Sequence, residues 1–481
     1  MKILIKNIKE AGLKCDALIL PVLEKEGIAL YKAIDESMGG VLGKISREFK
    51  GKHNEVSLLH TYGKIKPEKL LLIGLGKKKE LTREKLRQAG GKAVSYLRDL
   101  GVKEIALSTR LISMLRLKPS DFIEGGLLSD YRFLNYKEEK DHKAVKHMCV
   151  ISSKDLTKEI KYAEVTASSV LFARDLINTP SNDMTPALLF KAAKALKAKN
   201  VSVRVIDGKE AQRLGMGAYL SVARGSEEPP KFIVVSYAAK KTRPVVLIGK
   251  SITFDSGGIS LKPAEGMEKM KYDMAGGAAV LGVIKAAAEL GLPLCIVGLL
   301  PATENLPGGS ASKPGDVVRA IEGKTIEIIS TDAEGRMTIA DALGYAKRFK
   351  PRAVIDIATL TGACSIALGG EAIALMGNDE GLMEKLRHAG EETGERLWRM
   401  PLFDEYKEYI KSDVADIKNS SGKQGALVTA GYFLKEFAGE TPWAHLDIAG
   451  TAWTDKDKPY TPKGATGVGV RLLLEFLREF F

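Results

Sequence analysis

The sequence predicts an α/β protein of two domains, the larger of which is built on a mostly parallel, doubly wound sheet. Short apolar runs with strand character alternate with amphipathic helical stretches along most of the chain. A length of 481 residues corresponds to two or three domains of about 150 residues, and 45% hydrophobic residues suffice for a sizeable core. Nearly all of the net charge of +13 lies in the first third, which sets that part of the chain apart.

Residues 1–150 are predicted to form a small, basic N-terminal α/β domain. Its expected strands and helix are Lys2–Ile5, Ala17–Leu20, Leu70–Ile73 and Thr82–Leu100. This part holds 30 Lys and Arg against 19 Asp and Glu, whereas residues 151–481 are nearly balanced at 43 against 41. The excess is typical of a lysine-rich solvated surface, and it leaves open an acidic partner such as DNA.

The charge run 135–147, NYKEEKDHKAVKH, marks the predicted end of this domain. A connecting helix is expected over 151–170, within the helical stretch Leu156–Ile177, and the larger domain over 171–481. One helix of that domain is expected to begin at Thr185, with Pro186 in its first turn. Another is expected over Gly276–Leu290. Its expected strands are Val201–Ile206, Phe232–Ser236, Pro244–Ile248, Leu294–Leu299, Thr325–Ile329 and Ala353–Ile357. Ligands of such sheets bind beyond the carboxyl ends of the strands, so the site is expected just after these runs.

The cysteines and the hydropathy pattern favour a cytoplasmic protein. Four cysteines lie far apart and include no C-x-x-C pair, which favours reduced thiols over a zinc ribbon or a redox motif. The N-terminus has lysines within its short apolar run and no signal-peptide cleavage site. Since no run of about 18 apolar residues occurs, no contact with a membrane is expected.

Two groups of charged residues follow predicted strands. Lys250, Asp255, Lys262 and Asp273 come after the run Pro244–Ile248. The segment 330–336, STDAEGR, comes after Thr325–Ile329 and is expected to be extended, which would place Asp332, Glu334 and Arg336 on one face. Charged residues are almost never buried unpaired, so these groups are interpreted as a functional site at the sheet edge.

Four carboxylates at one edge would repel one another unless cations compensate their charge. Two divalent metal ions would balance Asp255, Asp273, Asp332 and Glu334, and a set of oxygen ligands with one amine suits manganese, magnesium or zinc. Lys250 would have to be neutral to act as a ligand, far from its usual pKa near 10.4. The alternative is a charged ion-pair partner of the carboxylates.

The six histidines argue against other hydrolase classes. None of them forms an H-E-x-x-H motif or lies in either charged group, which disfavours a single-zinc protease. The segment Asp255–Gly258, DSGG, is typical of trypsin-like serine proteases, but it lacks a histidine base and an all-β context. His445 is expected to be an ordinary structural residue.

The motifs around these residues closely resemble the leucine aminopeptidase (cytosol aminopeptidase) family over residues 160–481. They are RDLINTPSNDMTP from Arg174, GKSITFDSGGISLKP from Gly249, MKYDMAGGAAV from Met270, STDAEGRM from Ser330, ATLTGA from Ala358 and HLDIAGTAW from His445. The resemblance implies a central mixed, mostly parallel sheet flanked by helices, and a hexamer of two trimers. The first 150 residues match only in general pattern.

The resemblance also implies the role of each site residue. Lys250, Asp255, Asp273 and Glu334 would bind a tighter metal ion, while Asp255, Asp332 and Glu334 would bind an exchangeable one. Lys262 would stabilise the oxyanion, and Arg336 would hold a bicarbonate that acts as general base. The walls of the pocket for the first side chain of the substrate would be Met270, Thr359, Gly362 and Ala449. The Leu360 carbonyl would lie near the substrate amine.

Three positions depart from the usual pattern of that family. Ser330 stands where Asn is usual, Met337 where Leu is usual, and Ser251 where Gly is common. None of the three is a metal ligand or a catalytic side chain in the family. Activity is therefore expected to survive, while loop packing and metal preference are open.

The expected function is that of a two-metal aminopeptidase in intracellular peptide and protein turnover. Manganese or zinc, with cobalt or magnesium as alternatives, would activate a bridging water or hydroxide for attack on the peptide carbonyl. Leucine and similar N-terminal residues would be preferred, and a free α-amine would be required. The alternative function is DNA-binding regulation through the basic N-terminal domain, in addition to catalysis or instead of it.

Overall fold

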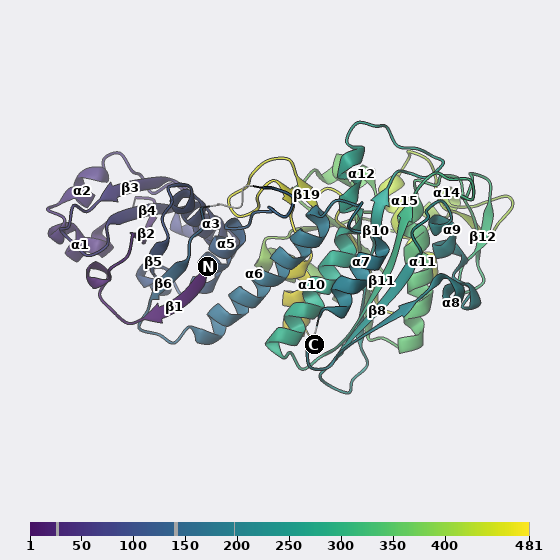
Figure 1. Ribbon diagram of the computed structural model, residues 1–481, viewed down its shortest axis with the longest axis horizontal. Helices are drawn as coiled ribbons and strands as arrows, with labels where there is room; N and C mark the ends of the chain where they lie inside the picture. The colour runs from purple at the N-terminus through teal and green to yellow at the C-terminus, as the bar shows by residue number, and fades with distance from the viewer. Residues whose placement is uncertain (26–27, 139–142, 197, 481) are drawn as a thin grey trace. The chain divides into compact units, whose positions relative to one another are not determined.

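The computed structural model describes residues 1–25, 28–138, 143–196 and 198–480, and it divides the chain into two compact units. Unit 1 comprises Met1–Ser168 and Lys456–Lys463, and unit 2 comprises Ser169–Asp455 and Gly464–Phe481 (Figure 1). Residues 139–142 of the charge run 135–147 lie outside the described residues. The helix α6 (Thr157–Asn178) runs through the point where the chain passes from one unit to the other.

Unit 1 is a three-layer α/β structure around a six-stranded sheet, with the strand order β1-β6-β5-β2-β4-β3. All neighbouring strands are parallel except β3, which is antiparallel to β4. The strands are β1 (Lys2–Lys6), β2 (Ala17–Leu23), β3 (Val56–His60), β4 (Lys69–Gly76), β5 (Glu104–Ser108) and β6 (His147–Ile151).

Side chains of β2 alternate between the two faces of this sheet, as the period of a strand requires. Ala17 and Ile19 pack in the core beneath α3 (Arg83–Asp99) and α5 (Pro119–Ser129). Leu18 and Leu20 face the opposite core, which includes residues of α1 (Lys32–Ser37) and α2 (Val41–Ile45). A strand that is apolar on both faces is therefore buried between two helical layers.

Unit 2 is built on a nine-stranded mixed sheet with the order β16-β15-β18-β14-β9-β11-β8-β7, and β10 pairs with β11 beside this path. The strands β18, β14, β9 and β11 are parallel neighbours, and antiparallel pairs occur at β15–β18, β11–β8 and β8–β7. The strands are β7 (Val201–Ile206), β8 (Lys231–Ala238), β9 (Val245–Gly249), β10 (Ser251–Asp255), β11 (Cys295–Asn305), β14 (Ala353–Ala358), β15 (Ile373–Gly377), β16 (Leu397–Arg399) and β18 (Trp443–Asp447). The predicted α/β class with a central mixed, mostly parallel sheet is confirmed.

Helices cover both faces of this sheet (Figure 1). The helices α9 (Gly217–Ala223), α11 (Glu334–Ala346) and α15 (Ala426–Ala438) pack with strand residues in one core. On the other face, α10 (Ala275–Leu290) contacts β8, β9, β11 and β14, and α16 (Val470–Phe480) packs against α10. In the described part of the chain, each helix is either too short or too polar to serve as a membrane span.

The expectation for Thr325–Ile329 was wrong in one respect. This run forms only the short strand β13 (Thr325–Glu327), which pairs with β12 (Val317–Arg319) and β17 (Ile417–Lys418) in a separate three-stranded sheet. A three-residue strand with one buried side chain carries too little apolar surface to join the central sheet. The segment after it reaches the site from this small sheet.

Candidate metal and active site

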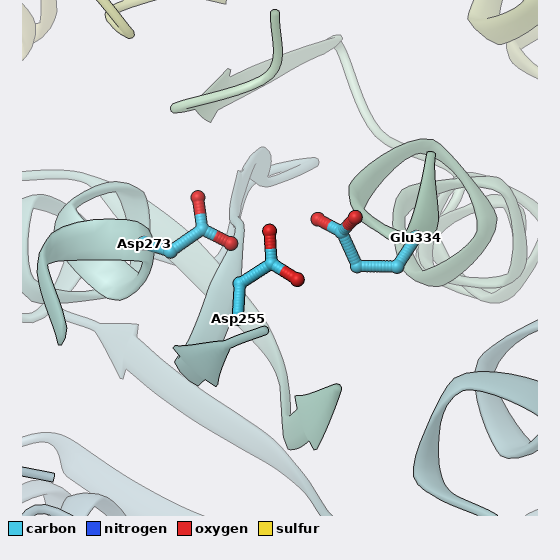
Figure 2. Close-up of side chains that lie close together, drawn as sticks. All are labelled: Asp255, Asp273 and Glu334. Atoms are coloured by element: carbon cyan, nitrogen blue, oxygen red, sulfur yellow. The ribbon is translucent and has the colours of Figure 1, made fainter. Parts of the chain in front are cut away.

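Three buried carboxylates meet beyond the carboxyl ends of the central strands (Figure 2). Asp255 ends β10, Asp273 lies in the 3-10 helix η4 (Met267–Met274), and Glu334 is the first residue of α11. One ligand atom from each lies within 4.8 Å of the others. The three side chains come from different elements and point into a shared space, with Asp255 between the other two in the view.

The turn after β10 fixes Asp255. Gly257 and Gly258 have φ values of 87° and 67°, a left-handed region that favours glycine. This turn lets the backbone N–H of Gly257 donate to Asp255 Oδ1 at 2.9 Å, and the Asn305 amide donates to the same oxygen at 2.8 Å. One carboxylate oxygen is thus held by the protein, while Oδ2 faces Lys262 Nζ at 2.8 Å.

Lys250 lies between two of the carboxylates. Its Nζ is 2.6 Å from Glu334 Oε1 and 2.9 Å from Asp273 Oδ2, and it donates to the Thr359 carbonyl at 2.9 Å. Burial alone would lower the pKa of this amine, but the carboxylates of Asp273, Glu334 and Asp255 outweigh it and raise the pKa above its ordinary value. The Lys250 amine therefore contacts carboxylates from two different elements, η4 and α11.

Lys262 connects the two charged groups, because one of its partners, Asp332, lies 70 positions later in the sequence. Its Nζ pairs with Asp255 and also with Asp332, which lies in the turn before α11. Burial opposes the charge, but Asp255, Glu334 and Asp332 outweigh it and raise the pKa of this lysine. A positive charge therefore stands at the rim of the carboxylate cluster.

The carboxylate cluster has the features of a site for divalent cations. Burial raises the pKa of Asp273 and of Glu334, because a charged carboxylate loses its hydration there. Glu334 Oε2 is buried and has no hydrogen-bond partner among the described residues. A divalent cation would use this free oxygen and would relieve the repulsion among the carboxylates, so the donor set fits such an ion.

Arg336 is a buried arginine without an ion pair in the described part of the chain. Its guanidinium donates one hydrogen bond, from Nη1 to the Asn419 carbonyl at 2.8 Å. Burial lowers the pKa of this group to about 10. The remaining N–H groups of a planar donor fork are available to an anion of matching geometry.

The expected extended geometry of Asp332, Glu334 and Arg336 was wrong. Asp332 lies in a turn, and α11 begins at Glu334, so Arg336 belongs to the first turn of a helix. The residues still serve one region, because Asp332 pairs with Lys262 and Glu334 with Lys250. The start of a helix, rather than a shared strand face, brings them there.

Most of the predicted pocket residues lie on two loops beside the cluster. Thr359 Oγ1 donates to Asp273 Oδ1 at 2.7 Å, and the backbone N–H groups of Leu360 and Ala449 both donate to Asp447 Oδ1 at 3.1 Å. Gly362 begins the short helix α12 (Gly362–Leu368), two residues after Leu360. Met270 lies half-buried in η4, three residues before Asp273.

Three supporting residues were missed by sequence reasoning. Asn305 holds Asp255, and Asn419 accepts hydrogen bonds from Ile329 and Ser330 and so fixes the segment before Asp332. Asp447 joins the two pocket loops. Asn305 and Asp447 each end a strand of the central sheet, so the rule that placed the charged groups could have found them; Asn419 carries no such signal.

Comparison with known sequences gives matches along most of the chain. Residues 171–474 match the catalytic domain of the cytosol aminopeptidase family, and residues 19–140 match the N-terminal domain of that family. A probable cytosol aminopeptidase of Geobacter sp. (strain M21) is 50% identical over 474 residues, 96% of either chain. The cytosol aminopeptidase of Pseudomonas aeruginosa is 43% identical over 498 residues, which cover 100% of this chain and 99% of the relative.

Solved structures with the same fold include two enzymes at 32% identity. A mutant of tomato leucine aminopeptidase superposes with a TM-score of 0.89 and covers 99% of this chain and 96% of its own. The bottromycin maturation enzyme BotP in complex with Mn superposes with a TM-score of 0.87 and covers 96% of this chain and 99% of its own.

Proposed function

The chain belongs to the cytosol aminopeptidase family and is an aminopeptidase, and from this premise we propose that it releases N-terminal residues from peptides by metal-dependent hydrolysis. Leucine and similar residues are the preferred N-termini. The observation that carries the proposal is the buried cluster of Asp255, Asp273 and Glu334 with its free carboxylate oxygen. A role in intracellular peptide and protein turnover follows from this activity.

Two divalent ions, manganese or zinc before cobalt or magnesium, are the proposed cofactors. Lys250, Asp255, Asp273 and Glu334 would hold one ion, and Asp255, Asp332 and Glu334 the other. Such a pair supplies a water of lowered pKa and polarises the scissile carbonyl. The Mn complex of BotP, a protein of the same fold, supports the choice of manganese.

The cationic side chains of the site serve the developing negative charge. Lys262 reaches the rim of the cluster from the loop after β10, and its ammonium would stabilise the oxyanion of the tetrahedral intermediate. Arg336 would hold a bicarbonate that accepts the proton of the attacking water, because its guanidinium is buried and forms no ion pair among the described residues. The substrate amine would lie near Asp273 and the Leu360 carbonyl, so a peptide with a blocked N-terminus would be rejected.

Three broader expectations remain predictions. The reduced state of the four cysteines, all free in the structure, and the cytosolic naming of the relatives support a cytoplasmic location. A homohexamer is testable by sedimentation. DNA binding by the basic residues 1–150 is testable by the fall of affinity with salt that phosphate contacts require.

The direct test is hydrolysis of leucyl-anilide by chelator-stripped protein, before and after addition of manganese, zinc, cobalt or magnesium. Activity should return with metal, and N-acetyl-leucyl-anilide should not be cleaved. Glu334→Gln should lower activity at least about 100-fold, since it removes a carboxylate shared by both proposed metal sites.

Glu304→Gln is the matched control for this variant. Glu304 is also a buried glutamate, although less deeply buried than Glu334; burial raises its pKa, and it accepts from Ser226 Oγ outside the cluster. Its replacement should leave the metal dependence intact. Folded wild-type protein that stays inactive with every metal would refute the proposed function.

A further inference from the structure

A fully buried carboxylate joins the two loops that form the proposed pocket. Asp447, the last residue of β18, accepts hydrogen bonds at Oδ1 from the backbone N–H groups of Leu360 and Ala449, both at 3.1 Å. Its Oδ2 accepts from Thr361 Oγ1 at 2.8 Å. One side chain therefore fixes the loop after β14 and the loop after β18 to each other.

The strand register makes this connection local and rigid. Strands β14 and β18 are parallel neighbours, and Ala358 pairs with Asp447 at their carboxyl ends. The two loops therefore leave the sheet side by side, and Asp447 stands at the point where they diverge. Thr361 Oγ1 also accepts from the backbone N–H of Cys364 and so caps α12, which extends the same network into the next helix.

Hydrogen bonds from the two loops stabilise the buried Asp447 carboxylate. Its three hydrogen-bond donors are neutral, and burial raises its pKa, while the nearby His445 lowers that pKa in part. A buried carboxylate is unfavourable unless hydrogen bonds compensate for the loss of its hydration. An asparagine in its place has only one acceptor oxygen, so it cannot accept from donors on both sides of the group.

We propose that Asp447 is a positioning residue that sets the shape of the pocket for the first side chain of the substrate. By holding the Leu360 N–H it orients the peptide unit there, and by holding Thr361 and Ala449 it sets the distance between the two walls. Asp447 acts on the substrate through these loops and does not touch the reacting atoms. The inference rests on the proposed aminopeptidase function.

A matched buried carboxylate lies on the neighbouring strand. Asp356 of β14 is also fully buried, and it accepts from Trp443 Nε1 at 2.7 Å and pairs with His445 Nδ1. All three residues lie within the strands of the sheet, away from the pocket loops. Asp356→Asn thus removes a buried charge beside His445, which also lies near Asp447, while it keeps every hydrogen bond that Asp447 accepts from the loops.

The test compares kcat and KM for leucyl-anilide and alanyl-anilide in the metal-loaded wild type, Asp447→Asn and Asp356→Asn. Asp447→Asn should lower the ratio of kcat/KM for leucine over alanine about tenfold, mainly through KM, because a lost hydrogen bond to a charged group corresponds to a factor of this size. Its metal content should equal that of the wild type. Asp356→Asn should leave the ratio unchanged even if it destabilises the protein.

A second pair of variants covers the case in which Asp447→Asn does not fold. Thr361→Val removes one of the three hydrogen bonds and should lower the ratio in the same direction, whereas Thr361→Ser keeps the hydroxyl and should restore it. An active wild type with an unchanged ratio in Asp447→Asn and Thr361→Val would overturn this inference alone, as would equal changes in Asp447→Asn and Asp356→Asn. An inactive wild type would overturn the proposed function and this inference with it.

Discussion

Single side chains around the carboxylate cluster decide how well it can hold cations. Asn305 is the clearest case, because its amide donates to Asp255 Oδ1 at 2.8 Å and to the Thr331 carbonyl at 3.0 Å. It thereby ties a carboxylate of the first charged group to the backbone next to Asp332. Outer residues that orient ligands in this way are worth a large part of the metal affinity.

Asn305→Ala should lower the affinity for manganese about 10- to 100-fold, since Asp255 then loses one of its fixed hydrogen bonds. The measurement is a titration of chelator-stripped protein with the metal, followed by calorimetry. The control is Asn378→Ala, because the Asn378 amide likewise donates two hydrogen bonds, here to two backbone carbonyls, and it belongs to a segment that contributes no residue to the cluster. Equal affinities in both variants would contradict the role of Asn305.

Arg336 gives a second prediction at this scale. Its buried guanidinium lacks an ion pair in the described part of the chain, so an anion is expected to complete it. The rate of the wild type should fall in carbonate-free buffer and recover with bicarbonate. Arg336→Lys should lose this response, because an ammonium lacks the planar fork that matches the anion.

Measurement of kcat at fixed pH and metal concentration checks this prediction. Lys262→Arg, which keeps a charge at the rim of the cluster, is the comparison variant and should keep the bicarbonate response whatever its rate. A wild-type rate that does not depend on bicarbonate would show that another group accepts the proton.

At the scale of elements, α10 meets the central strands backbone to backbone. A Cβ atom at Gly276 would lie 2.0 Å from the Ile357 carbonyl oxygen and 2.9 Å from the Lys250 backbone nitrogen. The small residues that begin this helix are therefore required by the distance between the helix and the strands. This contact places η4, and with it Asp273, beside Lys250.

Gly276→Ala should lower the free energy of unfolding of unit 2 by about 3 kcal/mol, because the methyl group forces the helix away from β14. It should also weaken metal binding, since Asp273 lies only two residues before the start of this helix. Denaturant unfolding followed by tryptophan fluorescence measures the first effect. Gly381→Ala in α13 (Glu380–Thr393) is the control. It should be neutral or stabilising, since the added Cβ would meet only Asp379 Oδ1, at 3.4 Å.

The helix α11 also carries a group that makes stability depend on pH. Asp341 accepts from the backbone N–H groups of Tyr219 and Ile321, both at 2.7 Å, and burial raises its pKa to about 7. In the unfolded chain its pKa is about 3.9. Between these values the folded state binds more protons than the unfolded state, so the stability that this group contributes is present at low pH and is lost as the pH rises through 7.

Asp341→Asn should remove this dependence. From pH 5 to pH 8 the free energy of unfolding of the wild type should fall by about 3 kcal/mol relative to that of the variant. The reason is that about two pH units of this range lie below the raised pKa of Asp341. Urea unfolding of the metal-free proteins at both pH values, followed by tryptophan fluorescence, provides the measurement. Parallel pH profiles of the two proteins would contradict the assignment.

For the whole molecule, a metal ion bound at the carboxylate cluster is expected to stabilise unit 2. The carboxylate cluster lies entirely within unit 2, and so do Trp398, Trp443 and Trp453, the three tryptophans of the chain. Tryptophan fluorescence therefore reports on unit 2, whereas far-UV circular dichroism reports on both units. The effect of a ligand can thus be assigned to one unit.

Removal of the metal by a chelator should lower the Tm that tryptophan fluorescence records, and manganese should restore it. At a free concentration about 100 times its Kd, the ion should add about 2.7 kcal/mol to the stability of the unit that binds it. Glu334→Gln should show no such shift. An identical fluorescence Tm with and without metal in the wild type would contradict a metal site in unit 2.

The sequence by itself determined the fold class and pointed to charged residues that gather at one site. The strands Val201–Ile206 and Ala353–Ile357 and the helices at Pro186 and Gly276 were predicted within a residue or two, because their apolar patterns and their helix-start signals are local. The charged residues were found because charged side chains that follow buried apolar strands do not stabilise a core, so they indicate a functional site. The ligand roles and the pocket stay predictions, which metal titration and substrate kinetics test.

Only the tertiary structure decided how these residues come together. It showed that α11 begins at Glu334, that the segment before it comes from a small separate sheet, and that Lys250 and Lys262 each bridge two carboxylates. It also revealed Asn305, Asn419 and Asp447, whose partners lie up to 90 residues away in the sequence. Such contacts follow from the order of strands in a sheet and from strand register, which depend on packing between distant segments and leave no local pattern.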